Sequence, residues 1–277
     1  MWPLLVVDGD SFAHRAYHAL PKTMRRGDGG PANALVGFTN MLLRLWSQER
    51  PRTVLVAWDS LDSPTYRHLE LPGYQAGREF DAELLEQLDL LPALVASTRL
   101  AVAKAAGYEA DDFLGAAVAR EEAAGGAVLV ATSDRDAFQL ASSRTTILQP
   151  VRGGVPARIG PGEVRERYGV EPRQVPDFIA LRGDPSDRIP GARGIGPKKA
   201  AELLRQYPSL EALLADGRFS AEAEALRLYL RVATLDREAP LPELPDLDPV
   251  WAGGAEHARA LGLEGVARRF EEALQWT

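Results

Sequence analysis

Three short runs of consecutive apolar residues predict buried strands, and each run ends at an acidic residue. The runs with the acids that follow them are Leu4 to Val7 before Asp8, Thr53 to Trp58 before Asp59, and Ala127 to Thr132 before Ser133-Asp134-Arg135-Asp136. Uninterrupted apolar runs of this length are typical of strands that are covered on both faces of a sheet.

Between these runs the apolar residues recur at helical spacing. Residues 34–46 carry Leu35, Phe38, Leu42 and Leu45 on one stripe, and a second helix is predicted to begin at Glu109. Alternating strands and helices indicate an α/β fold with a mostly parallel sheet flanked by helices. Ligands bind beyond the carboxyl ends of the strands in such folds. The acids that follow the three runs are therefore expected at one binding edge.

A dense acidic cluster, Glu109-Ala110-Asp111-Asp112, precedes the apolar stripe of the second helix. One or two acids at a helix start would offset the helix dipole. Three acids in four positions repel one another, by roughly 1 kcal/mol per pair at 4 Å in water and more when buried. A bound divalent cation would neutralise them. Because the chain has no cysteine and no histidine cluster, oxygen ligands for Mg²⁺ or Mn²⁺ are favoured over a zinc site.

Residues 61–97 interrupt the strand and helix pattern. The stretch up to residue 80 shows neither period and mixes aromatic with cationic side chains, and a helix is predicted over residues 81–97 with a kink or break at Pro92. Long irregular connections are usually functional, and this composition suits contacts with bases and phosphates. We expect residues 61–97 to form a flap over the acidic edge.

Beyond a further predicted strand over residues 145–151, the chain becomes mostly helical. Short helices are predicted over residues 162–168, 175–182, 198–206 and 210–214. Gly194-Ile195-Gly196-Pro197-Lys198-Lys199 combines a glycine turn, a proline suited to the first helical position and two lysines, which indicates a phosphate-backbone clamp of the helix-hairpin-helix type. Residues 239–249 contain four prolines and predict an extended linker, and residues 263–274 predict a helix that docks on the core. The expected divisions are 1–158, 159–238 and 239–277.

Composition narrows the class of protein further. With 277 residues, 45% of them hydrophobic, the chain can bury a sizeable core. The absence of cysteine excludes disulfides, thiolate zinc sites and a cysteine nucleophile. No run approaches 18 apolar residues and no basic leader precedes Leu4, so a cytoplasmic protein is expected. The net charge of −7 argues against indiscriminate binding of polyanions, although acids gathered in one metal site can coexist with a basic face.

Six motifs, in this order along the chain, resemble a known family. They are Val-Asp-Gly at residue 7, Trp-Asp at 58, Gly-Tyr-Glu-Ala-Asp-Asp at 107, Thr-Ser-Asp-Arg-Asp at 132, Gly-Asp-x-Ser-Asp-x-Ile-Pro-Gly at 183 and Gly-Ile-Gly at 194. The order is similar to that of the 5′-nuclease domain of bacterial DNA polymerase I, within the flap endonuclease family, over at least residues 4–240. The resemblance implies a PIN-like core with a helical arch at residues 61–97, an H3TH DNA-binding subdomain and a stand-alone nuclease without a polymerase domain.

The resemblance also assigns metal ligands residue by residue. It implies that Asp8, Asp59, Glu109 and Asp111 surround one divalent cation and that Asp112, Asp134, Asp136 and Asp187 serve a second, with Asp184 as a supporting acid. All nine acids are present, so catalytic competence is expected. Two such cations can activate a water and stabilise the leaving oxygen during in-line attack on a phosphodiester.

Contacts with nucleic acid follow from the same resemblance. Arg15, Arg67 and Arg78 match basic positions near the scissile phosphate, and Gln75 stands where the family usually has a lysine. No lysine lies between Lys22 and Lys104, so slower turnover than in lysine-bearing relatives is expected. The implied DNA-binding residues are Tyr74, Gly194, Ile195, Gly196, Lys198 and Lys199, with a potassium ion at the Gly194–Gly196 turn.

The implied activity is that of a monomeric, structure-specific 5′ nuclease in DNA replication and repair. Its substrates would be DNA with a 5′ flap, a nick or a 5′ single-stranded end, and RNA primer strands in Okazaki fragment processing. The sequence leaves open flap cleavage against 5′-3′ exonuclease trimming, and Mg²⁺ against Mn²⁺.

Three other interpretations were weighed. Asp8-Gly9-Asp10 also resembles the nucleophile motif of haloacid-dehalogenase-type phosphatases, but the required lysine and the spacing of Asp184 and Asp187 do not fit. A non-catalytic, structure-specific DNA-binding module would not need the full acid set. A PIN-type ribonuclease would usually be shorter and lack the turn at Gly194 to Gly196.

Overall fold

The fold is built on a six-stranded sheet, seen in a computed structural model that describes residues 2–77, 79–151 and 155–276. The strands are β1 (Leu4–Asp8), β2 (Thr53–Ala57), β3 (Ala101–Ala103), β4 (Val128–Ala131), β5 (Thr145–Gln149) and β6 (Ala157–Ile159), in the order β3-β2-β1-β4-β5-β6. Among the described strands of this sheet, the pairing of β5 with β6 is antiparallel and the others are parallel. The prediction of an α/β fold with a mostly parallel sheet is confirmed.

Alternate residues of the central strand serve two different cores. Leu4 and Val6 of β1 pack in one apolar cluster with α5 (Ala110–Ala123), whereas Leu5 and Val7 pack in a second cluster on the opposite face. This alternation is the period of two that a strand imposes on its side chains. Because both faces are covered, β1 shows an uninterrupted apolar run.

Five helices cover the second face of the sheet. They are α1 (Gly9–Ala19), α2 (Asn33–Glu49), α4 (Ala82–Ala96), α11 (Trp251–Ala260) and α12 (Glu264–Ala273). Trp251 of α11 packs edge-on against Trp46 of α2 and stacks on Phe270 of α12. Pro92 lies inside α4, which runs unbroken through it, so of the predicted kink or break at Pro92 the break is wrong and the kink stays a prediction.

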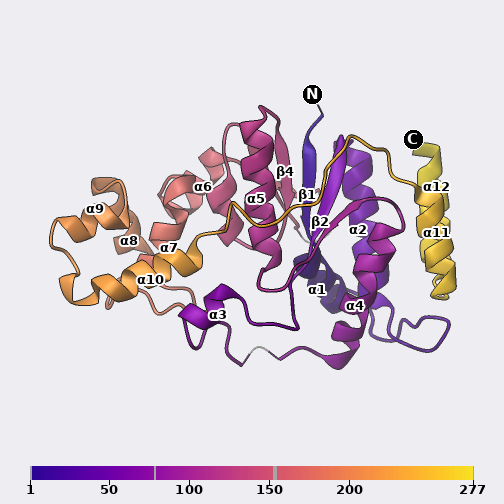
Figure 1. Cartoon of the computed structure of the whole chain (residues 1–277), viewed down its shortest axis with the longest axis horizontal. Coiled ribbons are helices and arrows are strands. Elements are labelled where there is room, and N and C mark those ends of the chain that lie inside the picture. The colour runs from indigo at the N-terminus through magenta and orange to yellow at the C-terminus, as the bar shows by residue number, and fades with distance from the viewer. Residues whose placement is uncertain (1, 78, 152–154, 277) are drawn as a thin grey trace.

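A helical unit extends from the other end of the sheet, on the left in Figure 1. It contains the elements α6 (Pro161–Tyr168), η2 (Pro172–Gln174), α7 (Val175–Arg182), α8 (Pro197–Gln206), α9 (Leu210–Ala215), η3 (Ser220–Glu222) and α10 (Ala223–Ala233). Four of these helices match the predicted ones to within a residue or two. The pattern analysis missed α10, α11 and the short strands β3 and β6. The boundaries placed after residues 158 and 238 stay a prediction.

An extended segment carries the chain back from α10 across the sheet to α11 (Figure 1). Arg52, which precedes β2, fastens this segment through hydrogen bonds from its Nη1 to the carbonyl oxygen of Leu244, at 3.0 Å, and to Asp246 Oδ1, at 2.6 Å. Its Nη2 bonds Glu121 of α5 at 2.5 Å. The predicted linker is thus held in a fixed path along the core.

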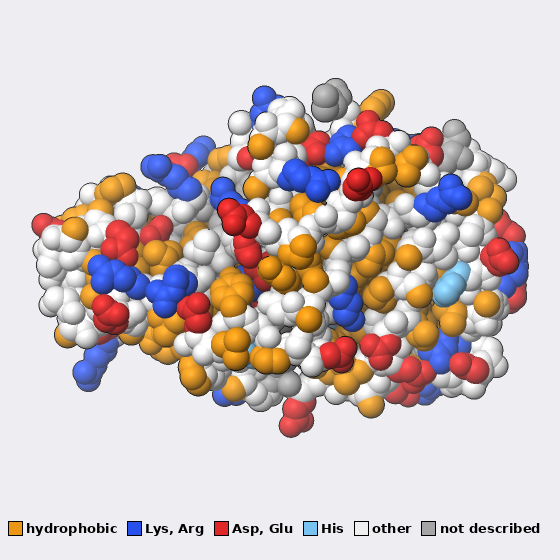
Figure 2. Space-filling view, in the orientation of Figure 1, with side chains coloured by type: hydrophobic (Ala, Val, Ile, Leu, Met, Phe, Trp, Pro, Cys, Tyr) orange, Lys and Arg blue, Asp and Glu red, His pale blue; other side chains and the backbone are white. Residues whose placement is uncertain are grey.

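The irregular segment before α4 contains the short helix α3 (Tyr66–Glu70) and runs below the carboxyl edge of the sheet in Figure 1. Acidic and basic side chains are interspersed over the face shown in Figure 2. Among the described residues no helix is long and apolar enough to cross a membrane.

Candidate active site

A cleft of about 1760 Å³ lies at the carboxyl edge of the sheet and brings together eight of the nine predicted metal ligands. These residues, which come from segments far apart in the sequence, are Asp8, Asp59, Glu109, Asp111, Asp134, Asp136, Asp184 and Asp187. Arg15, Tyr74 and Gln75 line the same cleft. The expectation that the strand ends converge there is therefore met by the geometry.

Asp8 occupies the centre of the sheet edge because it is both the last residue of β1 and the N-cap of α1. Its Oδ1 accepts a hydrogen bond from the Ser11 amide at 2.9 Å, and its Oδ2 accepts one from Thr132 Oγ1 at 2.6 Å. Burial, together with the charges of Asp59 and Asp134, raises the pKa of Asp8 to about 7. The site therefore resists ionisation of Asp8 unless a positive charge is supplied.

Asp10 is a cleft residue that the sequence analysis did not include among the ligands. Its Oδ2 accepts a hydrogen bond from the Asp59 amide at 2.7 Å, and Asp59 Oδ1 in turn accepts one from the Ala110 amide at 2.7 Å. Burial and the charge of Asp59 raise the pKa of Asp10 well above its ordinary value. The sequence Asp8-Gly9-Asp10 places this second acid two residues after Asp8, but the sequence analysis relates it only to the motif of the phosphatase alternative.

Two acids at the start of α5, Asp111 and Glu109, differ in their hydrogen bonds. Asp111 lines the cleft, and its buried Oδ1 has no hydrogen-bond partner among the residues that the structure describes. Burial, with the charge of Asp134 next in importance, raises the pKa of Asp111 well above its ordinary value. Glu109 lines the cleft with Oε1 bonded to Thr65 Oγ1 at 2.9 Å and Oε2 bonded to the Tyr74 hydroxyl at 3.0 Å.

Asp134 and Asp136 follow β4, and a tight local turn holds them. The Asp136 amide donates to Asp134 Oδ1 at 2.9 Å, and the Asp134 amide donates to Thr132 Oγ1 at 3.0 Å. Asp136 also begins the short helix η1 (Asp136–Leu140). Burial and the charge of Asp134 raise the pKa of Asp136 well above its ordinary value. Arg135, between the two acids, also lines the cleft.

The helical unit contributes Asp184 and Asp187 from the loop between α7 and α8. Asp184 Oδ2 accepts a hydrogen bond from Arg182 at 3.0 Å, and Asp187 Oδ1 accepts one from Gln75 Nε2 at 3.0 Å. Gln75 Nε2 also lies 3.1 Å from the Tyr74 hydroxyl. Gln75 thus bridges the helical unit and the Tyr74–Glu109 pair, at the position where a lysine was expected.

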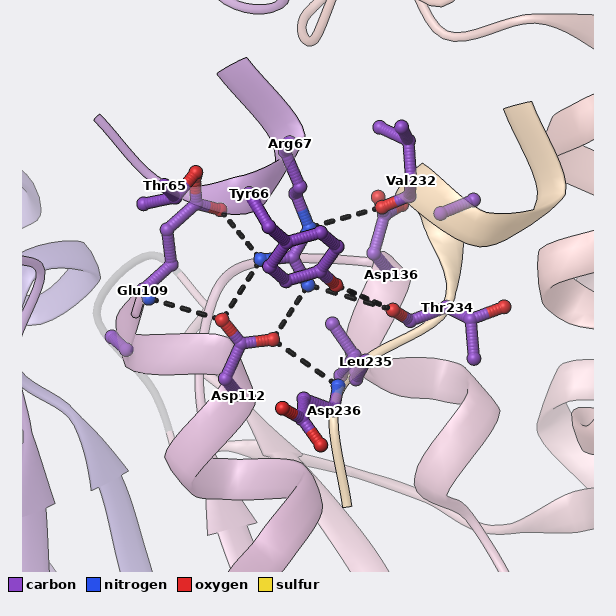
Figure 3. A network of polar contacts seen from close by, with 12 residues as sticks. Thr65, Tyr66, Arg67, Glu109, Asp112, Asp136, Val232, Thr234, Leu235 and Asp236 are labelled. Atoms are coloured by element: carbon purple, nitrogen blue, oxygen red, sulfur yellow. Dashed lines mark hydrogen bonds and ion pairs between the residues drawn. The ribbon is translucent and has the colours of Figure 1, made fainter. Parts of the chain in front are cut away.

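The structure places two predicted site residues, Arg67 and Asp112, outside the cleft lining, in the polar network of Figure 3. Arg67 is only 1% exposed and does not line the cleft, and its guanidinium bonds both carboxylate oxygens of Asp112, at 2.6 and 2.9 Å. Asp112 is fully buried and does not line the cleft. Neither side chain therefore faces the space in which the other predicted site residues meet. Both assignments came from family positions, which carry no information on burial.

The remaining basic assignments divide in a similar way. Arg15 is half-buried on the cleft wall, and no ion pair to it is found among the described residues. Arg78 lies outside the described residues. Lys198 and Lys199 are exposed on α8, away from the cleft lining.

The predicted clamp has the backbone of a tight turn. Gly194 adopts a left-handed conformation with φ of 72°, and an added Cβ at Gly194 or Gly196 would meet no atom within 4 Å. The Ile195 side chain is buried in the helical unit, so only its backbone could contact a ligand. The space around this turn is open to the approach of a phosphate backbone.

The cleft fits hard divalent cations by its donor chemistry. Several buried carboxylates repel one another, and the Asp111 oxygen that lacks a partner points to a missing positive charge. Within the described part of the chain, however, no three acidic or histidine side chains already enclose one ion. Mg²⁺ commonly keeps several waters and takes only one or two carboxylates together with substrate phosphates, so a spread set of acids suits it.

Comparison with known proteins places the chain in a family. The model of the 5′-3′ exonuclease N-terminal resolvase-like domain matches residues 3–169, and that of the 5′-3′ exonuclease C-terminal SAM fold matches residues 170–250. The chain therefore belongs to the 5′-3′ exonuclease family, and the prediction of a nuclease related to the 5′-nuclease domain of DNA polymerase I is confirmed at the level of the family.

Relatives and neighbours in structure agree with this assignment. DNA polymerase I of Mycobacterium bovis is 38% identical over 255 residues, which are 88% of this chain and 28% of that protein. DNA polymerase I of Bacillus caldotenax is 38% identical over 272 residues, which are 94% of this chain and 31% of that protein. The chain thus spans less than a third of either relative. A bacteriophage T5 flap endonuclease, crystallised with DNA and metal ions, shares the fold with a TM-score of 0.70 at 18% identity, covering 99% of this chain and 98% of its own.

Proposed function

We propose that this chain is a 5′ nuclease that hydrolyses phosphodiester bonds of DNA near junctions between single- and double-stranded segments. The observation that carries the proposal is the cleft in which buried, mutually repelling carboxylates converge around the Asp111 oxygen that lacks a partner. Such an arrangement destabilises the folded chain unless it binds cations, and carboxylate sites for paired divalent cations serve phosphodiester hydrolysis.

Two sets of acids would hold the two cations. Asp8, Asp59, Glu109 and Asp111 surround the sheet edge, whereas Asp134, Asp136 and Asp187 face them from η1 and the helical unit, with Asp184 supporting Asp187. When bound, two such ions lower the pKa of an attacking water and neutralise charge on the phosphate and the leaving oxygen. The residues themselves act as ligands, so none of them has to be the nucleophile.

Cationic side chains of the cleft would orient the strand. Arg15 on α1 and Arg135 between the two acids lie on the cleft wall, where they can pair with phosphates on either side of the scissile bond. The loop that carries Tyr74 and Gln75 closes one side of the cleft. Residues 61–97 would confine a 5′ single strand there.

The turn at Gly194 to Gly196 would hold the duplex away from the reacting phosphate. Its open glycines, the start of α8 at Pro197 and the exposed Lys198 and Lys199 suit a phosphate backbone, with a potassium ion as the bridging charge. The T5 flap endonuclease complex, which contains DNA and metal ions, supports DNA as the substrate. The DNA polymerase I relatives support a role in DNA replication and repair.

The test is cleavage of a 5′-labelled flap on a nicked duplex with magnesium, with manganese and with chelator. Metal-dependent release of the flap is expected, and Asp134→Ala should abolish it. Glu256→Ala, which removes an exposed acid of α11 outside the cleft, is the matched control and should cleave normally. Substrates with a recessed 5′ end or an RNA 5′ segment, run in parallel, rank flap cleavage against exonuclease trimming and DNA against RNA. If the flap stays intact while the protein still shifts the duplex in a gel, the chain is a binding module and the proposal is wrong.

A further inference from the structure

Arg67 is the most deeply buried cation among the described residues, and it makes contacts on two sides (Figure 3). On one side its Nη1 and Nη2 bond Asp112, and Nη1 also lies 3.3 Å from Glu109 Oε2. On the other side its Nε donates to the carbonyl oxygen of Val232, at the end of α10, at 3.0 Å. Burial alone would lower the pKa of Arg67, but the bonds to Asp112 and the charge of Glu109 raise it well above its ordinary value.

Asp112 has its carboxylate fully engaged. Besides Arg67, its Oδ2 accepts a hydrogen bond from the Glu109 amide at 3.0 Å and its Oδ1 accepts one from the Asp236 amide at 3.1 Å. A cation could use this carboxylate only by displacing a buried guanidinium, which would leave Arg67 charged and without a counter-ion. That loss is strongly unfavourable in the interior.

Residues 232–236, which receive hydrogen bonds from Arg67 and donate one to Asp112, also bond η1 and Tyr66 of α3. Gln139 of η1 donates to the carbonyl oxygen of Ala233 at 3.0 Å, and its Oε1 accepts from the Leu235 amide at 3.1 Å. The Tyr66 hydroxyl, beside Arg67, donates to the carbonyl oxygen of Thr234 at 3.2 Å. Residues 232–236 are thus fixed between α3, α5 and η1, at the point where the chain leaves the helical unit.

This junction lies between the two groups of proposed ligands. Its core side is the first turn of α5 with Glu109, and η1, which begins at Asp136. Its other side is α10, which packs on α7, and α7 leads directly into the loop that carries Asp184 and Asp187. Displacement of residues 232–236 would therefore move one group of acids relative to the other.

We propose that the Arg67–Asp112 ion pair is a positioning device for the nuclease reaction, which sets the helical unit relative to the acids of the sheet edge. In this role Asp112 is the counter-ion of Arg67 and not a cation ligand. The inference rests on the proposed nuclease function for its kinetic readout, but its stability and distance readouts do not depend on activity.

The first test separates a counter-ion from a ligand by the sign of a stability change without added metal. Asp112→Asn should lower Tm by about 10 °C, because breaking a buried pair leaves an uncompensated charge. Asp111→Asn is the matched control from the same helical turn and should leave Tm unchanged or raise it, because Asp111 only repels its neighbours. A rise in Tm for Asp112→Asn would overturn the proposal.

The second test is a double-mutant cycle in single-turnover cleavage with saturating magnesium. Arg67→Met and Asp112→Asn should each reduce the rate at least tenfold, and the double variant should be no slower than either single variant because no unpaired charge remains. If Asp112 were a ligand that acts independently of Arg67, the two losses would multiply, and that result would refute the counter-ion role. Failure of the unaltered chain to cleave would refute the nuclease function and leave the stability test intact.

The third test measures the positioning itself. The chain has no cysteine, so Gln48→Cys on α2 and Glu202→Cys on α8, both exposed positions, allow two spin labels to report the distance between core and helical unit. The distance distribution should be narrow in the labelled parent and broaden with Arg67→Met, and it should stay broad when Asp112→Asn is added, because the pair is still absent. An unchanged distribution in Arg67→Met alongside a lost cleavage rate would show that the pair does not position the helical unit.

Discussion

The two groups of acids that face each other across the cleft are held in different ways. Asp8 and Asp111 belong to the end of a central strand and the first turn of a buried helix, and their surroundings resist ionisation. Asp184 and Asp187 lie on a loop of the helical unit and already have partners in Arg182 and Gln75. We call the first the rigid group, because the sheet and α5 hold its carboxylates, whose ionised forms are unfavourable. The second, the loop group, has hydrogen-bond partners, and its position depends on the position of the helical unit.

The largest effect should come from the rigid group. Asp111→Asn preserves shape but removes the charge that no hydrogen bond compensates at Oδ1. We expect single-turnover cleavage to fall roughly 10³-fold, which corresponds to several kcal/mol of lost charge stabilisation. The measurement is quenched-flow cleavage of a labelled flap. A loss below tenfold would show that Asp111 is not a ligand.

A smaller effect is expected from the loop group. Asp187→Asn removes a half-buried carboxylate that water can replace in the shell of a hard cation, so we expect a loss of about 10²-fold. Raising the manganese concentration should recover part of this loss, whereas it should not rescue Asp111→Asn. A metal titration of both variants checks the contrast. Equal losses with equal rescue would remove the distinction between the groups.

A substitution of Gln75, which bridges the two groups, should increase activity. Gln75→Lys keeps a donor toward Asp187 and the Tyr74 hydroxyl and adds a positive charge at the cleft wall. We expect single-turnover cleavage to rise about fivefold, or roughly 1 kcal/mol. Gln75→Met, which keeps the length but removes the donor, serves as the control and should not accelerate the reaction. An unchanged rate in Gln75→Lys would contradict the idea that the missing lysine limits turnover.

The unfavourable ionisation of Asp8 in the rigid group should also make the stability of the protein depend on pH. Between about pH 4 and 7 the unfolded chain releases the Asp8 proton that the folded chain retains, so the free energy of unfolding falls as pH rises through this window. Cations favour the ionised carboxylates and should reverse the trend. We expect the rise in Tm caused by magnesium to be larger at about pH 8 than at about pH 5. Thermal melts at both pH values measure it, and an equal rise would exclude Asp8 from the metal site.

The acids that follow the strands could be predicted from the sequence. Asp8 and Asp134 were predictable because each follows an apolar run, and parallel strands bring their carboxyl ends to one edge. Asp10 lies at the same edge, but the sequence alone does not show that its carboxylate accepts a hydrogen bond from the Asp59 amide.

The burial of Arg67 could not be predicted from pattern or family position. Its motif places it at the base of the flap, but its direction is set by Val232 and Thr234, about 165 residues later in the chain. The same limit applies to α11, whose Trp251 packs on Trp46 of the distant helix α2. Local signals therefore identified the acids but not the contacts that orient them.

The return of the chain to the core after α10 has a consequence for folding order. Trp46 on α2 finds its partner Trp251 only after about 200 further residues have been added, so this core is closed by contacts of very high contact order. Before Trp251 is made, α2 packs on α1 and α4, but Trp46 still lacks its partner from α11. Two helices that come late in the sequence, α11 and α12, thus complete the packing of helices that come early.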